Sequence, residues 1–346
     1  MRVPNSLAYL MLMLWPLVVL VLFTVQRPER AFIWSILGGY LFLPPVAAFD
    51  MPLIPDLDKI AIPALSVLVV ATVFKGHRID ILPQTPLLRA VVVLFVLSPF
   101  ATALTNGEPV NVSGDAIGWA AAGPQARVLP GLVPYDGLAM ALWQVFTLIT
   151  FVLARHFLAT AAALRELLVA LMIGGLVYTP LMLIEIRLSP QLNTWVYGFF
   201  QHDWFQMVRS GGFRPIVFLT HGLWVAFFGL TAVLAATGLA RFEPSNRARH
   251  AAAALWLLAV LALCKTLGVM VYAAAFLPVL LFAAPLTIVR LCVVLAGFAF
   301  AYPILRATGL LPVNDIVALF NAFSPERAQS LGFRFYNEDV LMEHAL

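Results

Sequence analysis

The chain has few charged residues and almost no cysteine. Only 11% of its 346 residues are Asp, Glu, Lys or Arg, against about a quarter in an average soluble domain, and 62% are hydrophobic. This composition, with a mean hydropathy of +0.95, excludes an ordinary soluble domain. The two cysteines, Cys264 and Cys292, lie in apolar runs and predict neither a disulfide framework nor a metal site. The basic pI near 9.3 reflects loop charge, so we expect no nucleic-acid partner.

Apolar runs of roughly 17–25 residues, long enough to cross a bilayer, recur along the chain. They predict an all-α, polytopic transmembrane helix bundle over residues 1–305. The first run lacks a small-residue cleavage site, so it is read as a retained helix. About ten spans are expected, at 7–25, 31–49, 60–74, 87–105, 136–154, 165–186, 215–239, 251–265, 268–284 and 286–305.

Residues 251–284 are too long for one crossing, since a helix of that length would measure about 51 Å. Thr266 to Gly268 supply a turn beside Lys265, the only charge in the run. The sequence therefore predicts a helical hairpin that turns at this point.

The basic residues predict the orientation, because cytoplasmic loops retain Lys and Arg. An outside, periplasmic N-terminus gives the cytoplasmic side eleven basic and four acidic residues. The outer basic residues gather near the ends of the later spans and need another explanation; they include Arg187, Arg209, Arg214, Lys265, Arg327 and Arg334.

The segment from Arg209 to Gly222 contains two arginines, a Gly-Gly pair and His221 where a loop meets an apolar helix. Charged groups at a bilayer edge are costly and often functional, and here they favour an anion. Gly211 and Gly212 would let the backbone approach a phosphate closely.

The outer loops are of three kinds. Residues 106–134 are Gly-, Pro- and Asn-rich, as in an irregular surface loop. Residues 187–214 are rich in aromatic side chains, which suit either a headgroup-level belt or a platform for a sugar. Residues 306–346 look like the partly helical start of a large outer loop, with Ser324 as N-cap and Pro325 at the first helical position. There Glu338 lies one turn after Arg334 and is expected to hold its guanidinium, although a solvated helix on the membrane explains the pattern as well.

Three segments together resemble the O-antigen ligase/polymerase superfamily of bacterial inner-membrane enzymes. The first runs from Gly212 to Leu223, with Arg214 and His221 seven residues apart at the start of a helix. The second is Leu263 to Gly268, around Lys265, and the third is Glu326 to Asp339. The order of the motifs and the expected topology agree with this family over nearly the whole chain.

The resemblance implies a GT-C-like, inverting, metal-independent glycosyltransferase without a cofactor. Its substrate would be a glycan linked to undecaprenyl pyrophosphate, with membrane lipids and other polysaccharide-assembly membrane proteins as partners. By the same resemblance Arg214 and Arg334 would bind the pyrophosphate, with help from Lys265, Arg209 and Arg327, and His221 is the candidate catalytic residue.

The chain departs from the family at one point. Members continue into a Gly-rich loop and a later outer-loop histidine that is the presumed base, whereas this sequence stops at Leu346. His344 lies on the last helical turn and is not taken as that base. We therefore expect a fragment of a longer protein, with a degenerate member lacking the chemistry as the other reading.

Each candidate residue also has a structural interpretation. Arg214 could anchor a helix end by snorkelling, and His221 could pack a helix. Glu185 could pair with Arg187 or orient Arg214. Asp56 and Asp58 form an Asp-x-Asp pattern on the outer side, too short to establish a Mg²⁺ or Mn²⁺ site.

Three function classes therefore compete. The first is a polymerase or ligase on the periplasmic face. The second is a transporter or flippase of lipid-linked sugar, which would predict broken helices in paired halves that the sequence does not show. The third is a non-catalytic membrane component of polysaccharide assembly.

Overall fold

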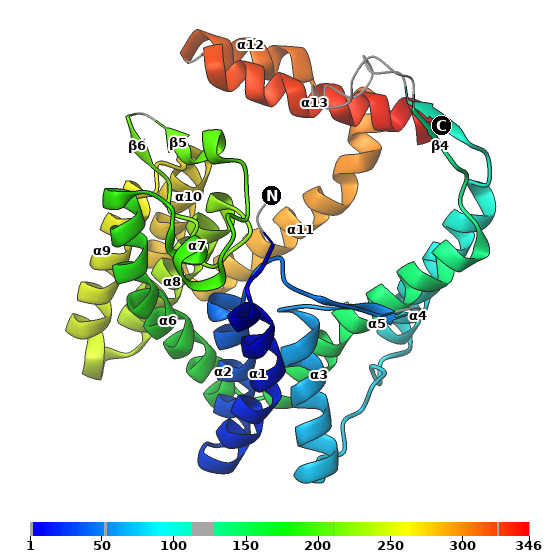
Figure 1. Ribbon diagram of the computed structural model, residues 1–346. Helices are drawn as coiled ribbons and strands as arrows, with labels where there is room; N and C mark the ends of the chain where they lie inside the picture. The colour runs from blue at the N-terminus through cyan, green and yellow to red at the C-terminus, as the bar shows by residue number, and fades with distance from the viewer. Residues whose placement is uncertain (1–2, 52–53, 113–126, 210, 324, 346) are drawn as a thin grey trace. The chain divides into compact units, whose positions relative to one another are not determined.

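The computed structural model describes residues 3–51, 54–112, 127–209, 211–323 and 325–345, and these residues are mostly helical. Three short antiparallel hairpins interrupt the helices: β1 (Phe49–Met51) with β2 (Ile54–Leu57), β3 (Val110–Val112) with β4 (Arg127–Leu129), and β5 (Val208–Arg209) with β6 (Gly212–Phe213). The helices, labelled in Figure 1, are α1 (Ser6–Val25), α2 (Pro28–Phe42), α3 (Ala61–Val69), α4 (Pro86–Thr105), α5 (Pro134–Phe157), α6 (Ala161–Leu188), α7 (Leu192–Tyr197), α8 (Gly222–Phe242), α9 (Arg247–Leu263), α10 (Leu267–Phe282), α11 (Pro285–Ala307), α12 (Val313–Phe323) and α13 (Pro325–Ala345).

Among the described residues six helices are long and apolar enough to cross a membrane: α1, α4, α5, α6, α8 and α11. The chain therefore has the character of a multi-pass membrane protein, as predicted. Helices α2, α3, α9 and α10 occupy the other four predicted spans but are shorter, so the count of ten spans stays a prediction.

Local sequence sets where these helices begin. The Asn5 side chain accepts a hydrogen bond from Ala8 N at the start of α1, and Thr160 does the same for Ala163 N at the start of α6. Pro28 and Pro285 occupy the first turns of α2 and α11, where a missing N–H has no cost.

The first compact unit comprises Met1–Thr102 and Tyr135–Ala283, and α8 is its most buried candidate span. Helix α8 packs against α6, α9 and α10 (Figure 1). Small residues permit this close approach, because a Cβ added at Gly175 of α6 would collide with Ala232 of α8, and one at Gly229 would press on Leu261 of α9. Small residues at helix contacts are what membrane interiors favour, since tight packing is a main source of association there.

Helices α9 and α10 form the predicted hairpin around α8. His250 near the start of α9 lies beside Glu243 at the end of α8, so α9 runs antiparallel to α8. Tyr272 of α10 contacts Phe227 of α8, and Arg241 at the end of α8 donates to the Leu280 and Ala283 carbonyls. Helix α10 therefore runs parallel to α8. The chain reverses beside Lys265 as predicted, but at Cys264 to Thr266, because Leu267 and Gly268, expected in the turn, belong to α10.

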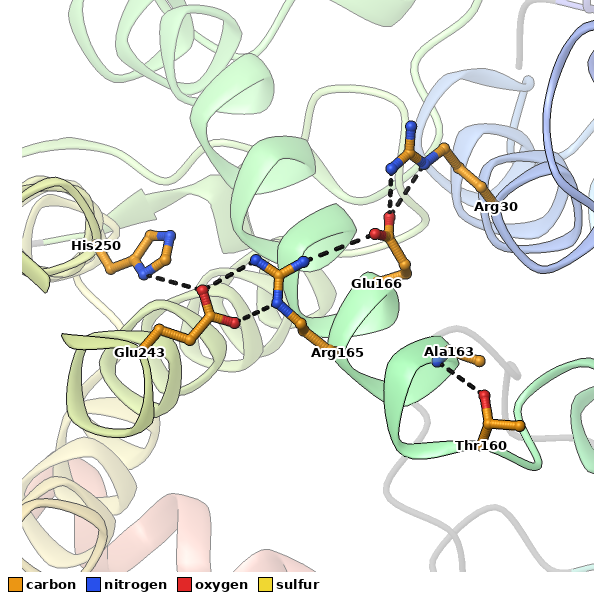
Figure 2. A network of polar contacts seen from close by, with 7 residues as sticks. All are labelled: Arg30, Thr160, Ala163, Arg165, Glu166, Glu243 and His250. Carbon is orange, nitrogen blue, oxygen red and sulfur yellow. Dashed lines mark hydrogen bonds and ion pairs between the residues drawn. The ribbon is translucent and has the colours of Figure 1, made fainter. Parts of the chain in front are cut away.

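Ion pairs join four helix ends at one end of this unit (Figure 2). Arg30 of α2 donates to Glu166 of α6 at 2.8 Å, and Arg165 contacts both Glu166 and Glu243. This ion-paired end brings together the loops that the sequence assigned to the basic, cytoplasmic side. The hydrogen bond from Arg165 lowers the pKa of Glu243.

The second compact unit comprises Ala103–Pro134 and Ala284–Leu346, and in it α12 packs against α13. Helix α13 starts at Pro325, as predicted. The expected Glu338–Arg334 pair is wrong. Glu338 instead accepts from Arg306 and Tyr302 of α11, because the buried Arg306 guanidinium reaches both Glu338 and Asp339, whereas Arg334 is exposed.

Candidate functional site

A fully buried carboxylate organises the end of the first unit opposite the ion-paired end. Glu185, in the last turn of α6, accepts hydrogen bonds from Ile216 N at 2.8 Å, Val217 N at 2.7 Å and Leu192 N at 3.0 Å. The expected partners, Arg187 and Arg214, are thus replaced by backbone amides. A buried carboxylate is stabilised when several N–H donors surround it, and here two donors belong to the loop that follows β6 and one to α7.

Residues 215–221, which we call the site loop, were predicted as the start of a membrane span, and this prediction is wrong. Helix α8 begins only at Gly222, and the site loop folds over the end of α6 instead. Val217 has a φ of 50°, a conformation that costs a β-branched residue about 1–3 kcal/mol. The hydrogen bonds from the Ile216 and Val217 N–H groups to Glu185 offset this strain, because two consecutive N–H groups must converge on one carboxylate oxygen.

Three further polar side chains hold the site loop. Tyr178 accepts from Phe218 N and donates to the Leu41 carbonyl, each at 3.1 Å. Gln201 donates to the Val217 and Leu219 carbonyls. The buried Lys59 ammonium donates to the Phe218 carbonyl at 2.8 Å. The site loop is therefore fixed through its backbone on several sides.

Arg214 lies directly before the site loop and is only 6% exposed. Its backbone N–H donates to the Met207 carbonyl at 2.8 Å, which extends the β5–β6 hairpin. Its Nη2 donates to Thr266 Oγ1 at 3.1 Å, and that hydroxyl donates to the Cys264 carbonyl. Thr266 therefore holds one arm of the Arg214 guanidinium in place.

Lys265 meets the same segment from the α9–α10 turn. A Cβ at Gly212 would collide with the Lys265 ammonium, so glycine is required for this approach. Lys265 itself has a φ of 52°, unusual for a residue with a side chain. Because Arg214 contacts Thr266 while Lys265 contacts Gly212, two cations predicted from distant motifs lie together.

Glycines at both ends of the segment leave space beside these cations. Gly211 forms the hairpin turn with a φ of 68° and has open space around it. At Gly222 an added Cβ would lie 3.1 Å from the Pro215 carbonyl oxygen and 3.7 Å from Arg214 Nε. The backbone at the start of α8 therefore lies against the guanidinium of Arg214.

His221 caps α8. Its Nδ1 accepts the Leu223 N–H at 2.8 Å, so in the neutral imidazole the proton is on Nε2. The ring lies 4.3 Å from that of His202, at 62° between planes. Nε2 is therefore the donor nitrogen of the neutral His221 ring.

The aromatic residues of the loop divide into two groups. Tyr197 and Phe199 are buried, and Tyr197 donates to the Phe42 carbonyl at the end of α2. Trp195, Trp204 and Phe205 are exposed, Phe205 at 85%. The exposed group keeps both predicted roles open: a headgroup-level belt and a sugar platform.

The remaining candidates add no described side-chain contact to this arrangement. Asp58 accepts from Ile60 N and Ala61 N and so caps the start of α3, whereas Asp56 is exposed on β2. The side chains of Arg209 and Arg327 lie outside the described part of the structure. Arg334 is on α13, in the second unit. The site therefore consists of residues from the first unit.

Sequence reasoning missed the roles of Tyr178, Gln201 and Lys59, which hold the site loop, and of Thr266, which holds Arg214. The signal was available in part, since Tyr178 is a polar group inside an apolar run and a buried hydroxyl needs a partner. Which backbone atoms it would meet depends on a fold that no local pattern specifies.

No protein-family model, no curated protein and no solved structure matches the chain. The proposed function therefore depends on the motifs and on the geometry of the site.

Proposed function

We propose that this multi-pass membrane protein is a glycosyltransferase of the O-antigen ligase/polymerase type. It would act on a glycan linked to undecaprenyl pyrophosphate, at the periplasmic face of a bacterial inner membrane. The observation that carries the proposal is the meeting of Arg214 and Lys265 beside glycine backbone at the start of α8.

This arrangement fits a pyrophosphate. A guanidinium presents a planar set of donors that matches phosphate oxygens, and an ammonium adds a point charge. Arg214 is held from one side by Thr266, and its position follows from a loop fixed through Glu185. Such a preorganised cation does not have to reorient when charge develops on a leaving pyrophosphate.

The position along the bundle supports a lipid-linked substrate. The site loop lies at the ends of α6 and α8, both long enough to cross a membrane. A lipid diphosphate has its charge at the membrane surface and its tail within the bilayer. Cations at the end of spanning helices are therefore at the right depth for it.

Substitution of Arg214 tests the proposal. We expect Arg214→Lys to lose glycan assembly nearly as completely as Arg214→Ala, because lysine keeps the charge but not the fork of donors. Loss of one charge-assisted hydrogen bond, worth about 1.5–3 kcal/mol, corresponds to roughly a 10- to 150-fold decrease in rate if the bond forms in the transition state.

The measurement is glycan chain assembly in cells whose own copy is deleted, with membrane abundance determined for each variant. Arg247→Lys and Arg247→Ala are matched controls, because Arg247 is exposed at the start of α9, near the ion-paired end. Near-normal assembly by Arg214→Lys at equal abundance would identify Arg214 as a helix anchor. Normal assembly by Arg214→Ala as well would favour a transporter or a non-catalytic component.

A further inference from the structure

A second imidazole lies beside His221, on the loop before the β5–β6 hairpin. The His202 and His221 ring centroids are 4.3 Å apart, and His202 is half-buried. Both rings lie at the start of α8, where His221 adjoins Gly222, whose backbone lies against Arg214.

The hydrogen bonds give the two rings opposite roles. His221 Nδ1 accepts the Leu223 N–H, so its Nε2 carries the proton and can only donate. His202 Nε2 lies 3.2 Å from Gln206 Oε1, and in the tautomer that donates to this oxygen Nδ1 retains the lone pair. Of the two imidazoles, His202 is therefore the one with a basic nitrogen to offer.

His202 is also held in place by its neighbours. The side chain of Gln201, the residue before His202, donates to the Val217 and Leu219 carbonyls of the site loop. Asp203 accepts from Phe205 N and starts the short 3-10 turn Trp204–Met207. A proton acceptor must keep its distance to the reacting group, and this double anchoring meets that requirement.

Aromatic rings flank His202 in the chain and lead toward Arg214. Trp204 contacts Phe200 at 5.3 Å and Phe213 at 6.1 Å between centroids, and Phe213 precedes Arg214. Trp204 is exposed, so a sugar ring stacked on it would lie close to the residue that leads into Arg214. The groups for the two kinds of chemistry that glycosyl transfer needs, proton removal and anion stabilisation, are thus at the same end of the first unit.

We propose that His202 is the proton acceptor of this site and that His221 is the donor that orients the acceptor hydroxyl; this inference rests on the proposed function. The hydroxyl oxygen of the acceptor sugar attacks the anomeric carbon of the donor. The bond from that carbon to the pyrophosphate breaks, and its electron pair leaves on the pyrophosphate oxygen beside Arg214 and Lys265. The hydroxyl proton moves to His202 Nδ1.

The pH dependence of glycan assembly by the intact protein in isolated membranes tests this inference. We expect the wild-type rate to fall as acid protonates one imidazole. His202→Gln should decrease the rate on the order of 10²–10⁴-fold, and its residual activity should lose that acid limb. His221→Asn should keep the α8 cap, since asparagine caps helices well, and should retain the acid limb at a lower rate.

Two further measurements keep the test decisive. Added imidazole should partly restore the rate of glycan assembly by His202→Ala. If His202 were needed only for folding, added imidazole would restore no activity. His156→Gln, near the ion-paired end where His156 contacts His77, is the control and should behave as wild type.

The outcomes separate the two proposals. If Arg214→Ala abolishes assembly but His202→Gln keeps the rate and acid limb of the wild type, His202 is not the proton acceptor and the proposed function stands. If Arg214→Ala also assembles glycan normally, the proposed function itself is overturned.

Discussion

At the residue scale, the position of Arg214 depends on side chains that never reach the proposed substrate. Glu185 binds two consecutive amides of the site loop and one of α7, and Tyr178 binds the next amide of the loop. Each of these groups is buried, so the loss of one hydrogen bond would leave a buried polar group with neither a protein partner nor water to bond to. The site loop is therefore expected to open as a unit when one of them is changed.

Glu185→Gln should destabilise the protein by about 1–3 kcal/mol, because the new amide group would face backbone N–H donors. Amide hydrogen exchange of residues 216–219 should become faster, and thermal unfolding in detergent should shift to lower temperature. Glu166→Gln is the control, since its surface ion pair with Arg30 is worth only about 0–1 kcal/mol. An equal effect of both substitutions would contradict the assigned role of Glu185.

Lys59 should make stability depend on pH. Burial lowers its pKa to about 7 in the folded protein, below its value in the unfolded chain. Between pH about 7 and 10 the unfolded state then binds more protons, so stability should rise with pH by at most about 1.4 kcal/mol per unit. Lys59→Met should remove this rise in thermal unfolding, whereas Lys75→Met, at an exposed position, should keep it. A wild type whose stability does not change over this pH range would show that burial does not lower the pKa of Lys59.

At the element scale, the helices could be predicted and the site loop could not. Apolar length located all ten helices of the expected spans, and the lone charge at Lys265 located the α9–α10 turn. Residues 215–219 are as apolar as a span, so hydropathy assigned them to α8. They leave the helix because Glu185, distant in sequence, binds their amides, and no local pattern contains that information.

The same limit applies to side-chain pairs. Glu338 and Arg334 have helical spacing, which predicts contact, but the buried Arg306 of α11 binds Glu338 instead. In contrast, the juxtaposition of Arg214 with the α9–α10 turn joins two segments that sequence reasoning had selected separately. The sequence motifs identified Arg214 and Lys265, whereas the side chains that position Arg214 could be identified only from the tertiary structure.

Substitution of Lys265 can separate the effect of its positive φ from the effect of its charge. Lys265→Gly should leave stability unchanged to within about 1 kcal/mol, since glycine adopts a positive φ without strain. It should nevertheless reduce glycan assembly, and Lys265→Arg should retain more activity than the glycine variant. Normal assembly by Lys265→Gly would remove the ammonium from the proposed anion site.

At the scale of the whole molecule, the two ends of the first unit differ in chemistry. Acidic and basic side chains pair at the ion-paired end (Figure 2), and the other end carries Arg214, which donates to Thr266, and Lys265, which lies against Gly212. The excess of Lys and Arg predicts that the ion-paired end faces the cytoplasm. The site would then face the periplasm.

Thiol labelling checks this orientation. Thr220→Cys and Ser245→Cys place exposed thiols at the site loop and near the ion-paired end, in a Cys292→Ser background that removes the exposed native thiol. An impermeant reagent should label Thr220→Cys in intact spheroplasts, and Ser245→Cys only after permeabilisation. Labelling of Ser245→Cys in intact spheroplasts would reverse the orientation.

Capture of a lipid diphosphate tests the central claim most directly. Membranes containing the protein would be irradiated with a photoactivatable polyprenyl-pyrophosphate glycan, and the cross-linked peptides would be identified. We predict cross-links within residues 208–223 and 260–270, competed by unlabelled lipid diphosphate and lost in Arg214→Ala. Equal capture by Arg214→Ala, or cross-links confined to residues 241–250 near the ion-paired end, would contradict the account.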